Sequence, residues 1–175
     1  MGKDLCAKEL TALFDKTPDD FLWNDYYNHA NEPVHQVVFM FNEIGLPWLT
    51  QKWSRKTCEK AYGADKYGIC GNEDVGQISA WYVLAASGFH PICPGDNKYQ
   101  ITSPVFNKIT FTLDTDYYSG KTFTVIANNN SKENVYIQSI KLNGKPLNRY
   151  YIYHQELSSG GELYLEMGPK PNQKI

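Results

Sequence analysis

Hydrophobic residues recur at helical spacing through the first half of the chain. Segments 3–14, 47–62 and 74–87 each carry apolar residues three and four positions apart, the pattern of amphipathic helices. Segment 34–44 is apolar on nearly every side, which predicts a buried helix. Gly88 follows the last of these segments as a C-terminal cap. Four helices are therefore predicted. The stripe of the first consists of Leu5, Leu10, Leu13 and Phe14.

After Pro94 the period of the pattern changes to two. Apolar and polar residues alternate in short runs that are separated by turn signals, which predicts strands with one buried and one solvated face. Asn143-Gly144 is a strong signal for a tight hairpin. We therefore predict an α+β fold, with a helical segment at 1–93 and an antiparallel β region at 94–175. The predicted strands are 98–104, 108–113, 121–127, 135–142 and 162–167.

Composition and charge limit the classes of function. The chain has 175 residues, 42% of them hydrophobic, and a net charge of −2, so it can bury a core and presents no basic surface for nucleic acid. No apolar run approaches the roughly 20 residues of a membrane span, and the first residues do not read as a signal peptide. The cysteines form no CxxC pair, which predicts buried free thiols rather than a zinc knuckle. They are Cys6, Cys58, Cys70 and Cys93.

Two runs of polar residues stand directly before helical segments. Small residues flank both runs, so a ligand can approach the backbone there. Loops gathered at one end of a helical array are common sites of function, and carboxylates from two such loops suit glycosidic bond cleavage or a hard cation. The first run contains Asn28, His29, Asn31 and Glu32, and the second contains Asn72, Glu73 and Asp74.

Helix capping is the structural alternative for both runs. Asp74 and Gln77, three residues apart, fit a capping box, and Glu73 would favour a helix N-terminus through the helix dipole. Pro33 suits a first helical turn that Asn31 or Glu32 would cap. A cap needs only one short polar residue, whereas each run supplies several. Both interpretations stay open at this point.

The chain resembles the C-terminal part of glycoside hydrolase family 92, the calcium-dependent exo-acting α-mannosidases. The resemblance extends over nearly the whole chain, in motifs that keep a fixed order. Members of this family have an N-terminal β-sandwich followed by an (α/α)6 toroid of paired helices. The resemblance implies that this chain supplies the last helices of the toroid and the antiparallel β region that follows them, and that it needs the upstream barrel and sandwich segments as partners. The motifs are NEPVHQVVFMFNEIGLPWLTQKW, YGICGNEDVGQISAWYVLAASGFHPICPG, YQITSPVFNKITFTL and YIQSIKLNGKPLNRYYI.

The resemblance also implies a calcium site in the first polar run. Asn31 and Glu32 match the family motif that holds Ca²⁺ against the O2 and O3 hydroxyls of a terminal mannose, with the Ala30 carbonyl as a third ligand. Amide, carboxylate and carbonyl oxygens are ligands that Ca²⁺ prefers. The neighbouring residues that we predict to contact the sugar are Tyr27, Asn28 and His29.

The second run matches the catalytic base region of the family. Asp74 takes the position of the base that activates a water, and Glu73 is placed to assist it. Asn72 departs from family members that carry Asp there, which puts a base made of two carboxylates in doubt. The general acid of the family is a glutamate well upstream, and before Glu32 this chain has only Glu9, inside an amphipathic helix. We therefore predict that the acid lies outside this chain, since an inverting enzyme needs both groups about 6.5–9.5 Å apart.

Taken together, these features predict part of a secreted or otherwise extracytoplasmic exo-α-mannosidase that acts by inversion with Ca²⁺ on mannose-containing glycans, with an α-1,2 linkage favoured. We expect the isolated chain to be inactive and prone to self-association. His35, Trp53 and Trp81 are predicted to be core residues. The alternatives are a structural piece, or a carbohydrate-binding module built on tyrosines of the β region, which are Tyr117, Tyr118, Tyr150, Tyr151 and Tyr153.

Overall fold

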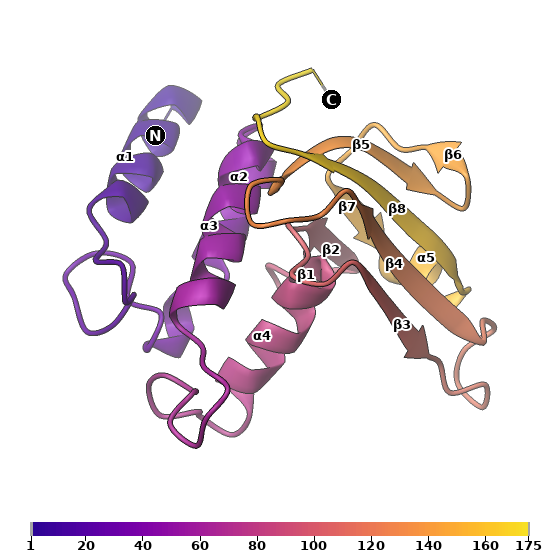
Figure 1. Cartoon of the computed structure of the whole chain (residues 1–175), viewed down its shortest axis with the longest axis horizontal. Coiled ribbons are helices and arrows are strands. Elements are labelled where there is room, and N and C mark those ends of the chain that lie inside the picture. Colours follow the sequence, from indigo (N-terminus) through magenta and orange to yellow (C-terminus); the bar gives the residue numbers. More distant parts are fainter. Residues whose placement is uncertain (1, 175) are drawn as a thin grey trace.

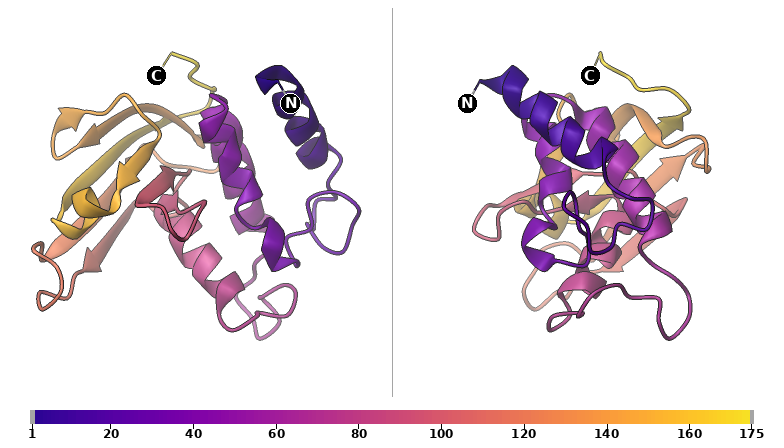
Figure 2. Two further views of the ribbon diagram at one scale, coloured as in Figure 1. Left: turned by 180° about the vertical axis from the view of Figure 1, so that it is seen from behind. Right: turned by 90° about the vertical axis from the view of Figure 1, so that its left-hand side faces the viewer.

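A computed structural model describes residues 2–174 and shows a helical layer packed beside two sheets (Figure 1). The α1 helix lies at the outer edge, and α3 and α4 lie between it and the strands in both front and back views (Figure 2). The helical elements of this layer are α1 (Lys3–Asp15), the 3-10 turns η1 (Glu32–Val34) and η2 (Val37–Phe39), α2 (Met40–Glu43), α3 (Pro47–Lys60) and α4 (Gln77–Ser87).

Aromatic side chains fill the core of the helical layer. Phe14 from α1 stacks on Tyr27 with ring centroids 4.4 Å apart, and Trp53 from α3 lies 5.4 Å from the same Phe14 ring. Trp53 and Trp81 are both buried, as the sequence predicted. The stripe predicted for α1 is confirmed at its inner end, where Leu10 and Phe14 are buried, whereas Leu5 is exposed.

Two sheets follow the helices. The smaller sheet has the strand order β1-β2-β7, and the larger has the order β3-β4-β8-β5-β6. The core of the strand half joins side chains of both sheets, among them Ile101 of β2 and Phe123 of β4. The elements are β1 (Phe89–His90), β2 (Lys98–Ile101), β3 (Lys108–Thr112), β4 (Thr122–Asn128), β5 (Tyr136–Leu142), β6 (Lys145–Pro146), β7 (Tyr151–Tyr153), α5 (His154–Ser158) and β8 (Gly161–Gly168).

The strand half confirms the predicted alternation but corrects the predicted pairing. Along β4 every second residue is buried, and Asn143 and Gly144 both have positive φ in the tight turn between β5 and β6. However, β4 and β8 run parallel, so the sheet is mixed rather than purely antiparallel. The chain passes from β5 through β6, β7 and α5 before β8 inserts between β4 and β5. This long return, which no local pattern encodes, sets the direction of β8.

Segment 34–44, predicted as one buried helix, is broken into η1, η2 and the short α2. Its local hydrogen bonds span three residues, from His35 N to Glu32 O and from Phe39 N to Gln36 O. The apolar residues of this segment pack on several sides of the core, and such burial does not distinguish one long helix from tight 3-10 turns. The predicted stop is confirmed, because Gly45 adopts φ +78° just after α2.

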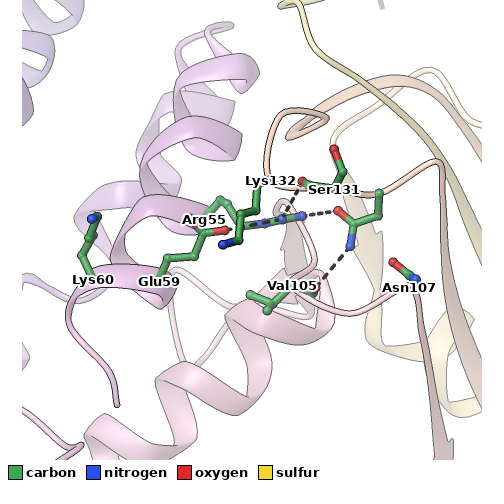
Figure 3. Close-up of a pocket in the computed structure, with 8 residues that line it drawn as sticks. Arg55, Glu59, Lys60, Val105, Asn107, Ser131 and Lys132 are labelled. Carbon is green, nitrogen blue, oxygen red and sulfur yellow. Dashed lines mark hydrogen bonds and ion pairs between the residues drawn. The ribbon is translucent and has the colours of Figure 1, made fainter. Parts of the chain in front are cut away.

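A buried arginine joins the helical layer to the strand loops (Figure 3). The Arg55 side chain, on α3, is 4% exposed and donates hydrogen bonds to the carbonyl oxygens of Ser103, Pro104 and Ser131 and to Oδ1 of Asn130. Glu59, one turn on, lies 3.7 Å from the guanidinium and is partly exposed. Most acceptors of this cation are thus neutral oxygens of the two strand loops, so Arg55 ties these loops to α3.

Two further predictions are tested by the fold. No helix within residues 2–174 is long and apolar enough to cross a membrane. The four cysteines are free thiols, as predicted, but the prediction that they are buried is confirmed only for Cys58, since Cys6 and Cys70 are half-buried and Cys93 is exposed.

Candidate functional site

The two polar runs lie against one another at the end of the helical layer where α4 begins. Gly71 adopts φ +66°, and a Cβ added to it would lie 2.5 Å from the Ala30 carbonyl oxygen. Only glycine permits this approach without displacing the other backbone. The loop 28–32 and the loop 70–74, forty residues apart in the sequence, therefore form one site.

Each of the two loops carries a carboxylate with an unpaired oxygen. One oxygen of Glu32 (Oε1) and one of Glu73 (Oε2) are buried and have no hydrogen-bond partner among the described residues. Burial raises the pKa of the Cys70 thiol to about 11, and the negative charges of Glu32 and Glu73 act in the same direction. Buried polar atoms in folded proteins are normally paired, so an unpaired carboxylate oxygen on each of two touching loops makes this junction a candidate ligand site.

The second loop makes a left-handed turn that the sequence did not predict. Glu73, Asp74 and Val75 have φ of 63°, 47° and 59°, and Gly76 follows with φ 89°. Because this conformation precedes the helix, α4 begins at Gln77 and no side chain caps its N-terminus. The predicted capping box of Asp74 and Gln77 is therefore wrong.

The first loop is not a helix cap either. Asn31 precedes η1 and makes no side-chain cap hydrogen bond. In the second loop, Glu73, Asp74 and Val75 are consecutive non-glycine residues at positive φ. Such a run is costly, and strain of this kind is concentrated at functional sites. A ligand site is therefore favoured over helix capping for both loops.

The exposed side chains of the site come from both loops. Asn31, Asn72 and Asp74 are exposed, while Glu32 and Glu73 are half-buried beneath them. The backbone of Gly71 packs against that of Ala30. The loop predicted to hold the metal is therefore in contact with the loop predicted to supply the base.

Two of the three residues predicted to contact the sugar are buried beneath the loop rather than exposed on it. Tyr27 and His29 are fully buried, and Asn28 uses its Oδ1 to accept hydrogen bonds from the backbone N–H groups of Trp23 and Ala30. In this structure Tyr27 and His29 support the loop from behind, so their effect on a ligand passes through the backbone that they hold.

A chain of hydrogen bonds links this backing layer to α4. Nδ1 of His29 lies 2.9 Å from the Tyr27 hydroxyl, and Nε2 of His29 lies 2.7 Å from the Tyr62 hydroxyl. The Tyr62 hydroxyl in turn donates to the carbonyl oxygen of Ile78 at 3.0 Å. A neutral His29 with its proton on Nε2 satisfies every bond in this chain. Burial, followed by the effect of His35 and His90, keeps the pKa of His29 well below its ordinary value.

His35 adds a second link and is a core residue, as predicted. Its Nε2 lies 2.9 Å from the carbonyl oxygen of His29, and its Nδ1 lies 3.4 Å from the side-chain amide of Gln77. Trp81 donates its indole N–H to the carbonyl oxygen of His35 at 2.9 Å. Burial lowers the pKa of His35, although the nearby Glu32 charge acts in the opposite direction.

Sequence reasoning missed Tyr62 and Cys70 as members of the site. Tyr62 is thirty-three residues from His29 in the chain, and no local pattern connects the two. Cys70 stands directly beside the second polar run, and this position was the one available signal. Its free thiol carried no motif that would separate it from the other cysteines.

A metal held at this site would need oxygen ligands of several kinds. Within residues 2–174, no three His, Cys, Asp or Glu side chains converge closely enough to hold an ion on their own. The unpaired oxygen of Glu32 and the neighbouring Asn31 amide are donors that suit a hard cation, which accepts mixed carboxylate, amide, carbonyl and water ligands.

Comparison with known proteins agrees with this geometry. The profile described as the glycosyl hydrolase family 92 catalytic domain matches residues 1–169. The chain belongs to glycoside hydrolase family 92. The resemblance in the sequence motifs is therefore confirmed, and the two converging loops are a segment of a glycosidase domain.

The family relatives include solved structures and a curated sequence. A family 92 α-mannosidase from Bacteroides thetaiotaomicron is 35% identical with a TM-score of 0.89, over 99% of this chain and 23% of that one. A family 92 inverting mannosidase from the same organism is 42% identical with a TM-score of 0.78, over 95% of this chain and 21% of that one. An uncharacterized secreted glycosidase from Arthroderma benhamiae is 36% identical over 79% of this chain and 18% of its own length.

The family 92 segment described here spans about a fifth of the length of these relatives. Its α+β architecture matches the corresponding part of the α-mannosidase structure.

Proposed function

We propose that this chain carries one side of the active site of an exo-acting α-mannosidase, where it holds a calcium ion and supplies the catalytic base. The observation that carries the proposal is the packing of Gly71 against Ala30, which brings two loops into contact, each with a buried carboxylate oxygen, of Glu32 and of Glu73, that has no partner among the described residues. The names of the two similar Bacteroides proteins, an α-mannosidase and an inverting mannosidase, support the substrate class and the stereochemistry.

The residues that would hold the ion are Glu32 and Asn31, with the Ala30 carbonyl as a further donor. The unpaired Oε1 of Glu32 fits this role, because a buried carboxylate oxygen without a hydrogen bond is stabilised by a cation. The Ala30 carbonyl lies directly against Gly71, so the second loop limits the space on that side. When bound, Ca²⁺ would hold the O2 and O3 hydroxyls of a terminal mannose.

Asp74 is the proposed base. Its carboxylate is exposed and makes no side-chain hydrogen bond to the residues described here, so it is free to accept a proton from a water that attacks the sugar. Asn72, also exposed, is placed to orient that water as a hydrogen-bonding group without a charge. Glu73 has a buried oxygen without a partner among the described residues, which suits assistance to a cation more than proton transfer.

The opposite side of the reaction belongs to other segments of the family domain. Inversion requires a general acid across the glycosidic bond from the base, with room for water between them. We place that acid, the remaining helices of an (α/α)6 toroid and the β-sandwich in the longer protein that carries this segment. An α-1,2 linkage and an extracytoplasmic location complete the proposal, the latter supported by the name of the secreted fungal relative. The 175-residue chain alone should lack mannosidase activity.

A calcium titration tests the site itself. Calorimetry of the chain with CaCl₂ should show one site that is lost in Glu32→Gln, which keeps the size of the side chain but removes its charge. The matched control is Glu162→Gln, a partly exposed glutamate in β8 far along the sequence from the loops. Equal calcium affinity in the Glu32→Gln variant and the wild type would place the ion elsewhere.

Enzyme kinetics test the base. In the longer enzyme, Asp74→Asn should lower kcat by about 10²–10⁴-fold with little change in KM, because a general base acts in the transition state. Turnover near that of the wild type would remove Asp74 from this role. The variant Asn72→Asp provides a second test. It would restore the paired carboxylates found in other family members and should not abolish activity.

A further inference from the structure

A polar groove lies on the strand half, at the opposite end of the molecule from the loops 28–32 and 70–74. It runs between the hairpin of β5 and β6 and the corner where β7 enters α5, and both views place these elements far from α1 (Figures 1 and 2). Its volume of about 880 Å³ is in the range of small-molecule pockets. The residues used in the argument that line it are Asn97, Asn143, Lys145, Tyr153, Gln155 and Glu156.

Three side-chain amides converge on this groove. Asn143 is fixed in place, because its Oδ1 accepts the backbone N–H of Glu162 at 2.8 Å and sits over Gly161, while its NH₂ group has no partner among the described residues. The side-chain amides of Asn97 and Gln155 make no hydrogen bond within residues 2–174. Each amide can donate and accept at once, which is the pattern that adjacent sugar hydroxyls require.

The tyrosine of the groove is held rigidly. The Arg149 guanidinium lies 4.8 Å from the Tyr153 ring centroid and 4.9 Å from that of Tyr151. Glu156 pairs with Arg149 through one oxygen at 2.5 Å and accepts the backbone N–H of Tyr153 through the other at 2.8 Å. A ring fixed in this way loses little entropy on binding, so it is a prepared surface for the apolar face of a sugar.

The groove has one charged side chain without an ion-pair partner among the described residues. Glu156 is already neutralised by Arg149, and Lys145 is the one further ionic side chain of the lining. The groove therefore offers hydrogen bonds and an aromatic ring rather than a strong field of either sign. This arrangement disfavours a multiply charged ligand.

We propose that this groove is a non-catalytic binding site for a neutral oligosaccharide. The Tyr153 ring packs on the C–H face of one sugar, and the amides of Asn97, Asn143 and Gln155 bond to its hydroxyls. The site goes beyond the proposed function and shares no residue with the loops that carry Glu32 and Asp74. In a glycan-degrading enzyme, a second point of attachment raises the concentration of chain ends near the active site.

The chain of 175 residues, labelled with ¹⁵N, provides the test with mannotriose as the probe. Titration should shift the side-chain amide signals of Asn97, Asn143 and Gln155, and the double variant Asn97→Ala/Gln155→Ala should bind about tenfold more weakly, as expected for two lost hydrogen bonds. Both substituted side chains are outside the core, so the fold is retained and circular dichroism of the variant should match the wild type.

Two controls separate this site from the proposed active site. Asn148→Ala removes an exposed amide that does not line the groove and should bind like the wild type. Glu32→Gln should also leave groove binding unchanged, so a failure of the calcium proposal does not affect this result. Absence of shifts in the three groove amides at saturating mannotriose, or unchanged affinity in the double variant, would overturn the proposal.

Discussion

The helical layer and the larger sheet are stabilised by different kinds of core. In the sheet, apolar residues such as Phe123 of β4 and Leu163 of β8 meet in an interior that is almost entirely hydrocarbon. In the helical layer, the aromatic core also encloses His29 and His35, joined by hydrogen bonds through Tyr27 and Tyr62.

This difference shows where the chain buries its polar side chains. Burying a polar side chain costs free energy unless each of its donors and acceptors is paired. A sheet can therefore be stable with no buried polar side chains. The network of the helical layer is fully paired around the histidines, yet it stands directly behind a loop whose Glu32 carboxylate has an unpaired oxygen. The network therefore holds the loop that carries Glu32 in addition to any contribution to stability.

The largest expected effect removes the apolar core of the sheet. Phe123→Ala should lower the free energy of unfolding by about 4 kcal/mol, since it leaves a cavity around a fully buried ring. Urea denaturation followed by circular dichroism measures the change. Thr122→Ala, on the adjacent exposed position of β4, should change stability by less than about 0.5 kcal/mol. Equal losses in the two variants would contradict a one-sided core.

The second-largest effect is expected from removing the Arg55 hydrogen bonds that connect the helical layer to the strand loops. Arg55→Met keeps the length of the stem but leaves the carbonyl oxygens of Ser103, Pro104 and Ser131 without their donor, so we expect a loss of about 3 kcal/mol. Lys60→Met is the matched control. Lys60 is an exposed cation that lines the pocket beside Arg55 (Figure 3), so its substitution should change the free energy of unfolding little. A neutral Arg55→Met would show that the two regions hold together without this cation.

The helical layer should also make stability depend on pH. Burial lowers the pKa of His29, His35 and His90, the last to about 4 from 6.5, so the folded state keeps these rings neutral while the unfolded state takes up protons. Stability is therefore fully present above about pH 6.5 and is lost as the pH falls toward 4. For His90 alone the loss between about pH 7 and about pH 5 is on the order of 2 kcal/mol.

Denaturation midpoints measured across this range, together with histidine ¹³C shifts, check the pH effect. The signal of His90 should stay mainly in the neutral form at pH 5, and those of His29 and His35 should titrate below pH 6.5. Protonation of His29 near pH 6.5 in the folded protein would contradict the network, because a charged imidazole cannot accept the Tyr27 hydroxyl at Nδ1.

The smallest effect tests a single link of the network. Tyr62→Phe removes the hydroxyl between Nε2 of His29 and the Ile78 carbonyl oxygen, and should cost about 1 kcal/mol. In the longer enzyme the same variant should lower calcium affinity more than this stability loss explains, because the loop that carries Glu32 loses its tie to α4. Tyr82→Phe, beside it on α4, is the control, and equal calcium affinity in both variants would assign Tyr62 to packing alone.

The sequence by itself determined the two classes of element and several of their ends. Helical periodicity predicted α1, α3 and most of α4, period-two alternation predicted the main strands, and the glycines at 45, 88 and 144 marked a stop, a cap and a turn. These features depend on local sterics and on the burial of one face, which neighbouring residues encode. The motifs around Glu32 and Asp74 likewise identified the family without any coordinates.

Tertiary structure decided what depends on distant contacts. The parallel pairing of β4 with β8 and the approach of Gly71 to Ala30 both join residues far apart in the chain. The breaks between Glu32 and Glu43 and the left-handed turn at Glu73 are further features that no local pattern predicted. A sequence records which residues are present, but only the folded chain sets which of its loops lie in contact.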